Sequence, residues 1–508
     1  MITKDNLIIM GIDSAMEITE FKLDVRPNHH AGCLVKFLIY EELPFDMLND
    51  QILSIMYQQD DTEELLFKGV VSQLIQEKEG NQIKISLSLL SASIQLDYNK
   101  YIRSFQNKEQ SYATLIKSIL EKHSGADVLF SVNEKENQAI SDLIIQYQES
   151  DWEFCKRIAS HVSSVLIPDI TTGQPKFYFG FSKGIKTNEE FSAYAVSLDK
   201  RYYQGKEDST YYKDQFVFYQ VESKNYYPVG TQTTLQGGRF YILSLRAGLA
   251  GGTVIFTYEI GMPVLYKTDR YYNRDLVGAS LTGTVIESDA GTVKVIFDKN
   301  PDEKNIQKNY PWTPAMGNVF SCMPEPGEKV SVLFKNSNEA EAIAMETFRG
   351  NDIADCSNIS SPADRYFTSA AGKEMKLVPN SIGLDNHTGN LLLLDDSAGI
   401  SFQGKTMELE AKGNIIINGN KISAFAPLQT TLLKGTMSGG SINICQDFNT
   451  SGKIKFLAQA TPYAEEELVR VSDVMDISTM EKQVIGMIPT GRCEEPLVHQ
   501  ALGMLIQG

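Results

Sequence analysis

The feature that most constrains the fold is a tract of short alternating segments over residues 372–456. The pattern there is one of short alternating pieces, and the apolar or alternating pieces at 415–417, 442–444 and 454–456 lie between turns. Glycines separate the pieces irregularly, at positions 389, 399, 404, 413 and 419. Strands this short cannot bury an apolar face within one chain. Stacking into rungs or winding with identical chains would bury it, so the tract predicts a β-solenoid or an intertwined trimeric β-prism.

Upstream of this tract the chain has the pattern of packed β domains. Residues 83–89 alternate apolar and polar side chains, as a half-buried strand does. Residues 170–272 are rich in tyrosine and punctuated by glycine turns, which is typical of a packed sheet. Residues 276–350 hold about five short strands, the size of a small Greek-key barrel such as an OB-fold. The predicted fold class is therefore mainly β with a small helical part: β-barrel-like N-terminal domains, an OB-fold and a C-terminal β-helix or β-prism.

The small helical part consists of two segments with helical periodicity. The first covers about 111–124 and begins after Ser111, a residue type that caps helices. The second covers about 151–163 and begins with Ser150 and Glu153, the pattern of a capping box. Each segment places its apolar residues on one face, which predicts packing against the core.

Composition and charge exclude several functional classes. The 508 residues carry a net charge of −17 and the sequence pI is about 5.0. An acidic surface repels phosphate backbones and anionic lipids, so we expect no nucleic-acid partner. The first residues do not form a signal peptide, and no run reaches the ~18 apolar residues of a membrane span. Six cysteines are scattered without a close pair, which indicates neither a zinc site nor a disulfide framework.

One motif favours an enzyme. Gly399, Gly404, Lys405 and Thr406 fit the pattern G-x-x-x-x-G-K-[ST] of a phosphate-binding loop, and the apolar run before Asp395 resembles a magnesium-binding strand. Such a loop must open a helix, whose N-terminus attracts the phosphates. The residues that follow, up to position 412, alternate strictly and end at a glycine, which predicts a strand. We therefore expect no nucleotide site.

Other catalytic and metal signatures are weaker. The patterns G-x-S-x-G and H-E-x-x-H do not occur. His29 and His30 are adjacent, so on a strand they would point to opposite faces, and we expect both to be solvated loop residues. The remaining histidines are isolated in the sequence: His123, His161, His387 and His499. We predict no catalytic residues, no cofactor-binding residues and no metal ligands, hence no enzyme.

Three segments carry a family resemblance. Residues 147–159 contain Asp151 and Trp152 before Arg157 and Ile158, an acid-aromatic start followed by an Arg-Leu-like pair. Residues 320–334 contain Met-Pro-Glu-Pro-Gly-Glu-Lys-Val, and residues 368–389 are followed by two aspartates, Asp395 and Asp396. In this order they resemble the hub helix, the OB-fold signature and the spike entry of the VgrG proteins of type VI secretion and the related hub-and-spike proteins of contractile phage tails. The resemblance spans about residues 1–460.

The resemblance implies an order of domains. Residues 1–275 would form the hub that adapts to the tube, and residues 276–350 the OB-fold. Residues 351–369 would be a linker and residues 370–460 the intertwined β-spike. Residues 461–508 would be a C-terminal extension beyond the spike.

The resemblance also implies a structural function and a set of partners. The protein would link the tube to the piercing tip of a type VI system, an extracellular contractile injection system or a phage-tail-like particle, and help to puncture the target envelope and deliver cargo. It would be a homotrimer. Its partners would be an Hcp-like tube protein, baseplate proteins around the hub, and a PAAR-like tip protein or effector cargo at the C-terminal end. It would assemble in the bacterial cytoplasm without a signal peptide and leave with the injected tube.

Two departures from the family and two alternatives remain. The spike tract lacks the regular valine-glycine rhythm of the family and is short, which predicts a stubby needle. Only about 20 residues separate Arg349 from Ala370, too few for the lysozyme domain that some phage relatives carry there. The alternatives are a carbohydrate-binding or carbohydrate-degrading tail fibre and a P-loop NTPase. Residues 372–456 contain neither tryptophan nor tyrosine, which disfavours a glycan-binding surface.

Overall fold

The computed structural model divides the chain into two compact units, Met1–Ser357 and Asn358–Gly508. Among the described residues of both units strands far outnumber helices, so the predicted fold class, mainly β with a small helical part, is confirmed. The structure describes residues 1–12, 17–43, 51–59, 62–131, 135–181, 185–191, 193–199, 213–266, 269–301, 303–314, 322–348, 361, 363–369 and 371–423.

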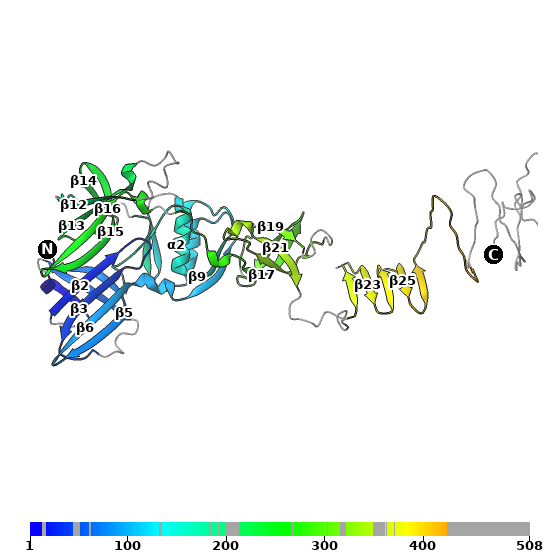
Figure 1. Ribbon diagram of the computed structural model, residues 1–508, viewed down its shortest axis with the longest axis horizontal. Coiled ribbons are helices and arrows are strands. Elements are labelled where there is room, and N and C mark those ends of the chain that lie inside the picture. The colour runs from blue at the N-terminus through cyan, green and yellow to red at the C-terminus, as the bar shows by residue number, and fades with distance from the viewer. Residues whose placement is uncertain are drawn as a thin grey trace, which may run out of the picture. The chain divides into compact units, whose positions relative to one another are not determined.

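A large antiparallel sheet forms most of the N-terminal part of the first unit (Figure 1). Its strands are β1 (Leu7–Met10), β2 (Glu17–Val25), β3 (Gly32–Ile39), β4 (Ile52–Gln59), β5 (Thr62–Glu79), β6 (Gln82–Ser91), β12 (Tyr194–Leu198), β13 (Val217–Ser223), β14 (Gln232–Leu235), β15 (Gly238–Ala250) and β16 (Thr253–Gly261). They follow the order β1-β4-β5-β6-β3-β2-β15-β16-β13-β12, and β14 pairs with β15. Strand β2 pairs with β15, and Val25 lies opposite Leu245. This pair joins an early and a late segment of the N-terminal part into one sheet.

Alternate residues of these strands fill one hydrophobic core. In β3 every second side chain is buried, and in β6 the buried positions are Ile83, Ile85, Leu87 and Leu89. The strand predicted at 83–89 is therefore confirmed, with the predicted inward face. Burying a large apolar side chain contributes about 1.5–3 kcal/mol, so a core of this size holds the sheet together.

Two helices and five short strands form a second layer of the first unit. Helices α1 (Tyr112–Leu120) and α2 (Asp151–His161) lie within the ranges expected for helices and end a few residues earlier. The strands are β7 (Lys100–Phe105), β8 (Asp127–Phe130), β9 (Ile144–Ser150), β10 (Leu166–Pro168) and β11 (Lys176–Phe179). The apolar stripes of both helices meet in one buried cluster, so their predicted core packing is confirmed. In the described ranges, every helix is too short or too polar to span a membrane.

A closed barrel follows in the same compact unit. It consists of β17 (Ser280–Asp289), β18 (Thr292–Phe297), β19 (Tyr310–Thr313), β20 (Lys329–Leu333) and β21 (Ile343–Phe348), in the order β17-β18-β19-β21-β20. Its interior is apolar and includes Val285, Val295 and Val332. The same cluster contains Leu143 and Ile145, which lie outside the barrel, so the barrel shares its core with the segment around β9.

The described part of the second unit is a stack of antiparallel strands (Figure 1). The strands are β22 (Arg365–Thr368), β23 (Glu374–Val378), β24 (Ser381–Asp385), β25 (Leu391–Asp395) and β26 (Gly399–Gln403), and each pairs with the next. Tight turns connect them. Gly389 and Gly399 adopt φ values of +106° and +85°, which glycine adopts readily because it lacks a Cβ atom.

The strands expected after β26 are not formed. Residues 404–423 contain no strand, which corrects the predictions at 406–412 and 415–417. Their apolar side chains are exposed, with Ile416 at 83% and Leu409 at 69% exposure. A strand gains its ladder hydrogen bonds only from a neighbouring strand, and one chain offers this segment none among the residues described. The strands predicted at 442–444 and 454–456 and the extension 461–508 lie outside the described residues.

Candidate functional site

Helix α2 begins at a capped turn that the sequence predicted in part. The Ser150 Oγ accepts a hydrogen bond from the Glu153 N–H at 3.1 Å, as an N-cap serine does. The Glu153 carboxylate binds Lys156 Nζ at 2.7 Å instead of completing a reciprocal capping box. Ser150 is also the last residue of β9 and pairs with Lys100, which places its backbone in a strand ladder. The predicted capping box is therefore corrected to a single serine cap.

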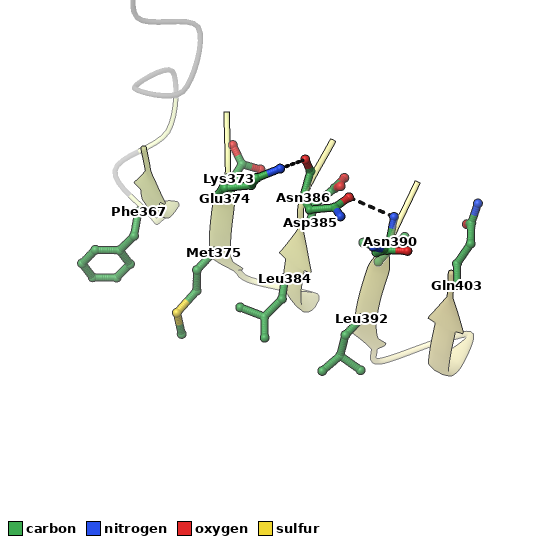
Figure 2. A pocket seen from close by; sticks show the side chains of 11 residues that line it. Phe367, Lys373, Glu374, Met375, Leu384, Asp385, Asn386, Asn390, Leu392 and Gln403 are labelled. Carbon is green, nitrogen blue, oxygen red and sulfur yellow. Dashed lines mark hydrogen bonds between the residues drawn. The ribbon is translucent and has the colours of Figure 1, made fainter. Parts of the chain in front are cut away.

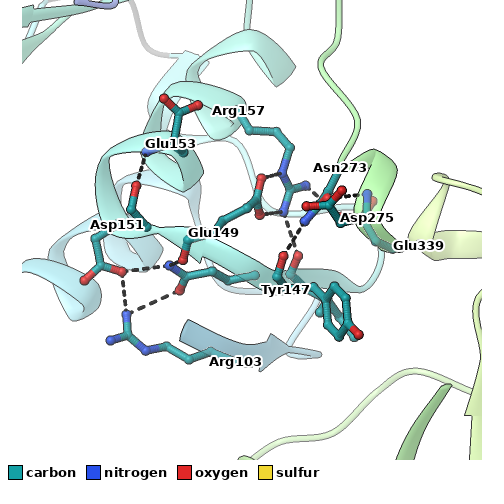
Figure 3. A network of polar contacts seen from close by, with 12 residues as sticks. Arg103, Tyr147, Glu149, Asp151, Glu153, Arg157, Asn273, Asp275 and Glu339 are labelled. Atoms are coloured by element: carbon teal, nitrogen blue, oxygen red, sulfur yellow. Dashed lines mark hydrogen bonds and ion pairs between the residues drawn. The ribbon is translucent and has the colours of Figure 1, made fainter. Parts of the chain in front are cut away.

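The carboxylate of Asp151 ties this helix start to three other elements, and Figure 3 shows the contact with Arg103. Its Oδ1 accepts hydrogen bonds from Arg103 Nη1 on β7 and Gln146 Nε2 on β9, both at 2.8 Å. Its Oδ2 lies 2.6 Å from Nε2 of His123, just after α1. Asp151 is fully buried, and a buried carboxylate is tolerated only when it is paired in this way. Asp151, the acidic residue at the start of α2, thus has a structural role: it connects the helix to its neighbouring elements.

The aromatic residue of the same start is a core anchor. The Trp152 indole is buried, with its ring centroid 4.6 Å from that of His30 and 5.6 Å from that of Phe177. His30 comes from the loop between β2 and β3, and Phe177 from β11. Trp152 therefore joins the helical layer to segments on either side of it.

Arg157, one turn and a half further along α2, bridges to the barrel (Figure 3). Its Nε and Nη2 donate to the two carboxylate oxygens of Glu149, each at 2.8 Å, and its Nη2 also donates to the Ile145 carbonyl at 2.6 Å. Its Nη1 donates to Glu339 Oε1 at 2.7 Å, and Glu339 belongs to the loop before β21. Burial alone lowers the pKa of Arg157, but the charges of Glu149 and Glu339 outweigh it and raise the pKa above its usual value.

The loop between β18 and β19 makes a second polar contact with the layer of helices. The Glu303 carboxylate accepts hydrogen bonds from the Gln106 N–H at 2.6 Å and from the Ser104 hydroxyl. The Tyr310 hydroxyl donates to Gln106 Oε1 at 2.8 Å, and Gln106 Nε2 donates to the Val295 carbonyl at 3.0 Å. Gln106 lies just after β7. Both its amide oxygen and its amide nitrogen therefore bind groups of the barrel.

The stack β22–β26 has one face that is almost entirely apolar, called the apolar face below. Two rows of directly paired residues cross its strands. One row is Phe367, Met375, Leu384, Leu392 and Phe402; the other is Arg365, Leu377, Ile382, Leu394 and Ile400. Figure 2 shows Phe367, Met375, Leu384 and Leu392 projecting from the same side of the stack, beside a shallow open groove.

This apolar face is exposed in the single chain. Ile400 and Phe402 are 67% and 64% exposed, and Ile382, Leu384 and Leu394 are also exposed. The opposite face is mixed: its central row is Tyr366, Lys376, Gly383, Leu393 and Ser401. A folded chain rarely leaves a continuous apolar sheet face in water, so this face marks a surface for association.

The segment that resembles a phosphate loop begins on a strand, Gly399–Gln403, and its Lys405 and Thr406 lie just after that strand. Gly399 opens β26, which pairs with β25, and no helix follows Lys405 within residues 404–423. Asp395, the residue that resembled a magnesium ligand, instead closes the turn before β26. Its Oδ1 accepts hydrogen bonds from the Ser397 N–H at 2.9 Å, the Ser397 hydroxyl at 2.7 Å and the Ala398 N–H at 2.8 Å, and these bonds lower the pKa of its carboxyl group.

The prediction that His29 and His30 are solvated loop residues is wrong for His30. Its Nε2 lies 2.7 Å from Asp97 Oδ2 and its Nδ1 lies 2.8 Å from Ser93 Oγ, while His29 is exposed. Serine, histidine and aspartate in this order resemble a nucleophilic triad. Ser93 is completely buried, however, and shares a hydrogen bond of 2.8 Å with the buried hydroxyl of Ser91. A nucleophile in that position cannot meet a substrate, so the arrangement is a core hydrogen-bond network.

The other described histidines, which are isolated in the sequence, have different surroundings in the structure. His123 pairs with Asp151 as described above, and His387 Nδ1 lies 3.5 Å from Asp385 Oδ2 in an exposed turn of the stack. Both ring nitrogens of His161 are buried. His499 lies outside the described residues. The described ranges contain no group of three or more histidine, cysteine, aspartate or glutamate side chains placed to hold a metal ion.

The fold and these contacts define a class: a β-rich protein in which a sheet-and-helix base carries a closed barrel, with a separate strand stack that exposes an association face. Residues 34–162 match the family model of the phage tail baseplate hub, GPD. This range includes β3 to β9 and helix α2 with Asp151, Trp152 and Arg157. The resemblance to hub-and-spike proteins of contractile injection systems that the sequence predicted is thereby confirmed over residues 34–162.

Several solved structures are similar to this chain at low sequence identity. An Escherichia coli protein, c3393, described as a component of the type VI secretion system with similarity to the phage T4 tail proteins gp27 and gp5, is 14% identical with a TM-score of 0.49, over 68% of this chain and 99% of that chain. The lidless PdpA–VgrG complex is 9% identical with a TM-score of 0.48, over 76% of this chain and 93% of that chain. The Shewanella oneidensis MuSo2 43 kDa tail protein is 10% identical with a TM-score of 0.39, over 51% and 99%. No curated protein matches the chain.

Proposed function

We propose that this protein is the hub and spike at the tip of the tube of a contractile injection system, where it links the tube to the piercing tip. The match of residues 34–162 to the phage tail baseplate hub model supports the hub part of this proposal. The observation that supports a spike is the apolar face of β22–β26, which a single chain leaves exposed. A hub that ends in such a face is suited to transmit force through a rigid multi-chain needle.

The occupant of the apolar face is a pair of identical chains. Three copies of a flat five-stranded stack, each turned with its apolar face inward, enclose a triangular prism and cover all three faces at once. Each large apolar side chain buried in this way contributes about 1.5–3 kcal/mol, so the rows through Leu384 and Leu392 supply ample free energy for assembly. The exposed apolar residues of segment 404–423 would find neighbouring strands in the same assembly.

The remaining partners follow from the two ends of the chain. The hub end would meet an Hcp-like tube protein and baseplate proteins, and the C-terminal end a PAAR-like tip protein or effector cargo. The protein would assemble in the bacterial cytoplasm and leave with the injected tube. We propose a structural role without catalysis, because the segment that resembles a phosphate loop begins on a strand and the serine of the triad-like network is buried.

The trimer can be tested with two neighbouring leucines that lie on opposite faces of β25. Leu392 belongs to the apolar face, between Leu384 and Phe402, whereas Leu393 lies on the mixed face between Gly383 and Ser401. Leu392→Glu places a charge in the proposed core of the prism and should shift the protein from trimer to monomer. Native mass spectrometry of the full chain at micromolar concentration measures the shift.

Leu393→Glu is the matched control, because it adds the same charge to the same strand on the other face. It should leave the trimer intact. A wild-type chain that is a stable monomer under these conditions, or a Leu392→Glu chain that remains trimeric, would contradict the proposal.

A further inference from the structure

The barrel is connected to the base of the first unit by one covalent link, the segment between β16 and β17. Its noncovalent contact has an apolar centre, in which Leu143 and Ile145 join the barrel core. Apolar contact is non-directional and scales with the buried area. A barrel held only by such a centre and one connector could therefore swivel with little loss of buried surface.

Directional contacts surround this centre on three different elements. Arg157 of α2 binds Glu339 of the loop before β21 at 2.7 Å. Glu303 of the β18–β19 loop accepts the Gln106 N–H at 2.6 Å. Further along the same loop, Lys308 Nζ lies 2.8 Å from Asp142 Oδ1, just before β9. Three directional contacts from different elements fix the orientation of one body on another.

The Arg157 contact is the most constrained of the three. Glu149 binds the guanidinium through two parallel hydrogen bonds, a geometry that fixes the plane of the group and aims Nη1 at Glu339. Arg157 is 3% exposed and Glu339 is fully buried. Buried ion pairs add little net stability compared with apolar side chains of the same volume, but they tolerate only one geometry.

We propose that Arg157 and Glu339, supported by Glu303 and Lys308, form an orientation lock that holds the barrel in one rotational position on the hub. Arg157 and Glu339 are thus positioning residues. Their value to the machine, which is to keep the needle in line with the tube, rests on the proposed hub-and-spike function. The lock itself is a property of the folded chain and can be measured without any injection assay.

The test is Glu339→Leu in the full chain. Leucine removes the acceptor and keeps much of the volume, and Arg157 stays neutralised by Glu149, so the protein should melt close to the wild-type temperature. Fluorophores on non-natural residues at the exposed positions Lys122 and Asp289 report the position of the barrel relative to the helical layer. Single-molecule energy transfer, with labelled chains diluted into unlabelled ones, should show one narrow distance distribution for the wild type and a broader or split distribution for Glu339→Leu.

Two further variants complete the design. Glu287→Leu removes an exposed glutamate of β17 that pairs with Lys294 of β18 at 2.6 Å, a contact within the barrel's own strands, and it should keep the narrow distribution. Glu339→Gln retains an oxygen acceptor without the charge and should give an intermediate width. A Glu339→Leu distribution as narrow as that of the wild type overturns the proposal; if that variant does not fold, a wild-type width for Glu339→Gln overturns it instead.

Discussion

At the scale of single residues, His161 at the end of α2 is a partly buried base. Its ring meets that of Tyr112 edge-on, with centroids 5.9 Å apart, and both ring nitrogens are buried. Burial, together with the positive charges of Arg270 and Arg157, lowers the pKa of His161 to about 3. The folded chain therefore holds this imidazole neutral over the acidic range in which a free histidine becomes charged.

We expect the free energy of unfolding to fall as the pH is lowered from about 6.5 towards 3. The pKa of His161 is lower in the folded than in the unfolded chain, so the unfolded chain binds an extra proton in this window, and stability is lost there. His161→Phe keeps an aromatic ring beside Tyr112 and should reduce the loss, by up to a few kcal/mol. Urea unfolding followed at a series of pH values measures the effect.

His387→Phe serves as the control for this pH dependence, because the His387 side chain is 51% exposed. It should leave the pH dependence unchanged. An equally steep fall in stability for wild type and His161→Phe would show that another group is responsible.

Local residue roles could be predicted from the sequence, whereas long-range pairs could not. Ser150 and Trp152 follow from helix periodicity and capping rules, which act over a few residues. The pairs Asp97–His30 and Arg157–Glu339 join positions 67 and 182 residues apart, and no local pattern connects them. The sequence therefore predicted the hub helix but missed its contact with the barrel.

At the scale of elements, a segment with an alternating pattern forms a strand where the same chain supplies a neighbouring strand to pair with. β6 and β26 lie in ladders with adjacent strands of this chain, and both fall in regions of alternation. Residues 406–412 alternate equally well and are not a strand, because alternation predicts which face is buried but not whether a partner is present. Sequence patterns thus predict strands of an assembly as readily as strands of a chain.

The position of Lys405 after β26 leads to a prediction for the motif that resembles a phosphate loop. Without a helix N-terminus, the backbone N–H groups cannot converge on phosphate oxygens. We expect no saturable binding of magnesium-ATP by isothermal titration calorimetry, for the wild type or for Lys405→Ala. Binding by the wild type that Lys405→Ala removes would contradict the strand geometry.

At the scale of the whole molecule, the first unit contains its own sheet, helical layer and barrel cores. A chain that ends at Ser357 should therefore keep the cooperative thermal unfolding of this unit, since none of these cores uses the stack. It should lose most of its tendency to trimerise, because the apolar face is deleted. Circular dichroism and analytical ultracentrifugation measure the two properties separately; loss of the folded state on truncation would contradict the division into units.

Successive side chains of each strand in the stack point to opposite faces. This has a consequence for how such a needle can change in length. Insertion of one residue within β25 would exchange the positions of Leu392 and Leu393 and turn every later side chain of that strand to the wrong side. Insertion of a whole strand with its turn keeps the phase and adds one more apolar pair, and it lengthens the stack by about 4.8 Å. Needle length can thus change only in steps of one complete strand. Insertions or deletions that give intermediate lengths would turn apolar side chains to the wrong face.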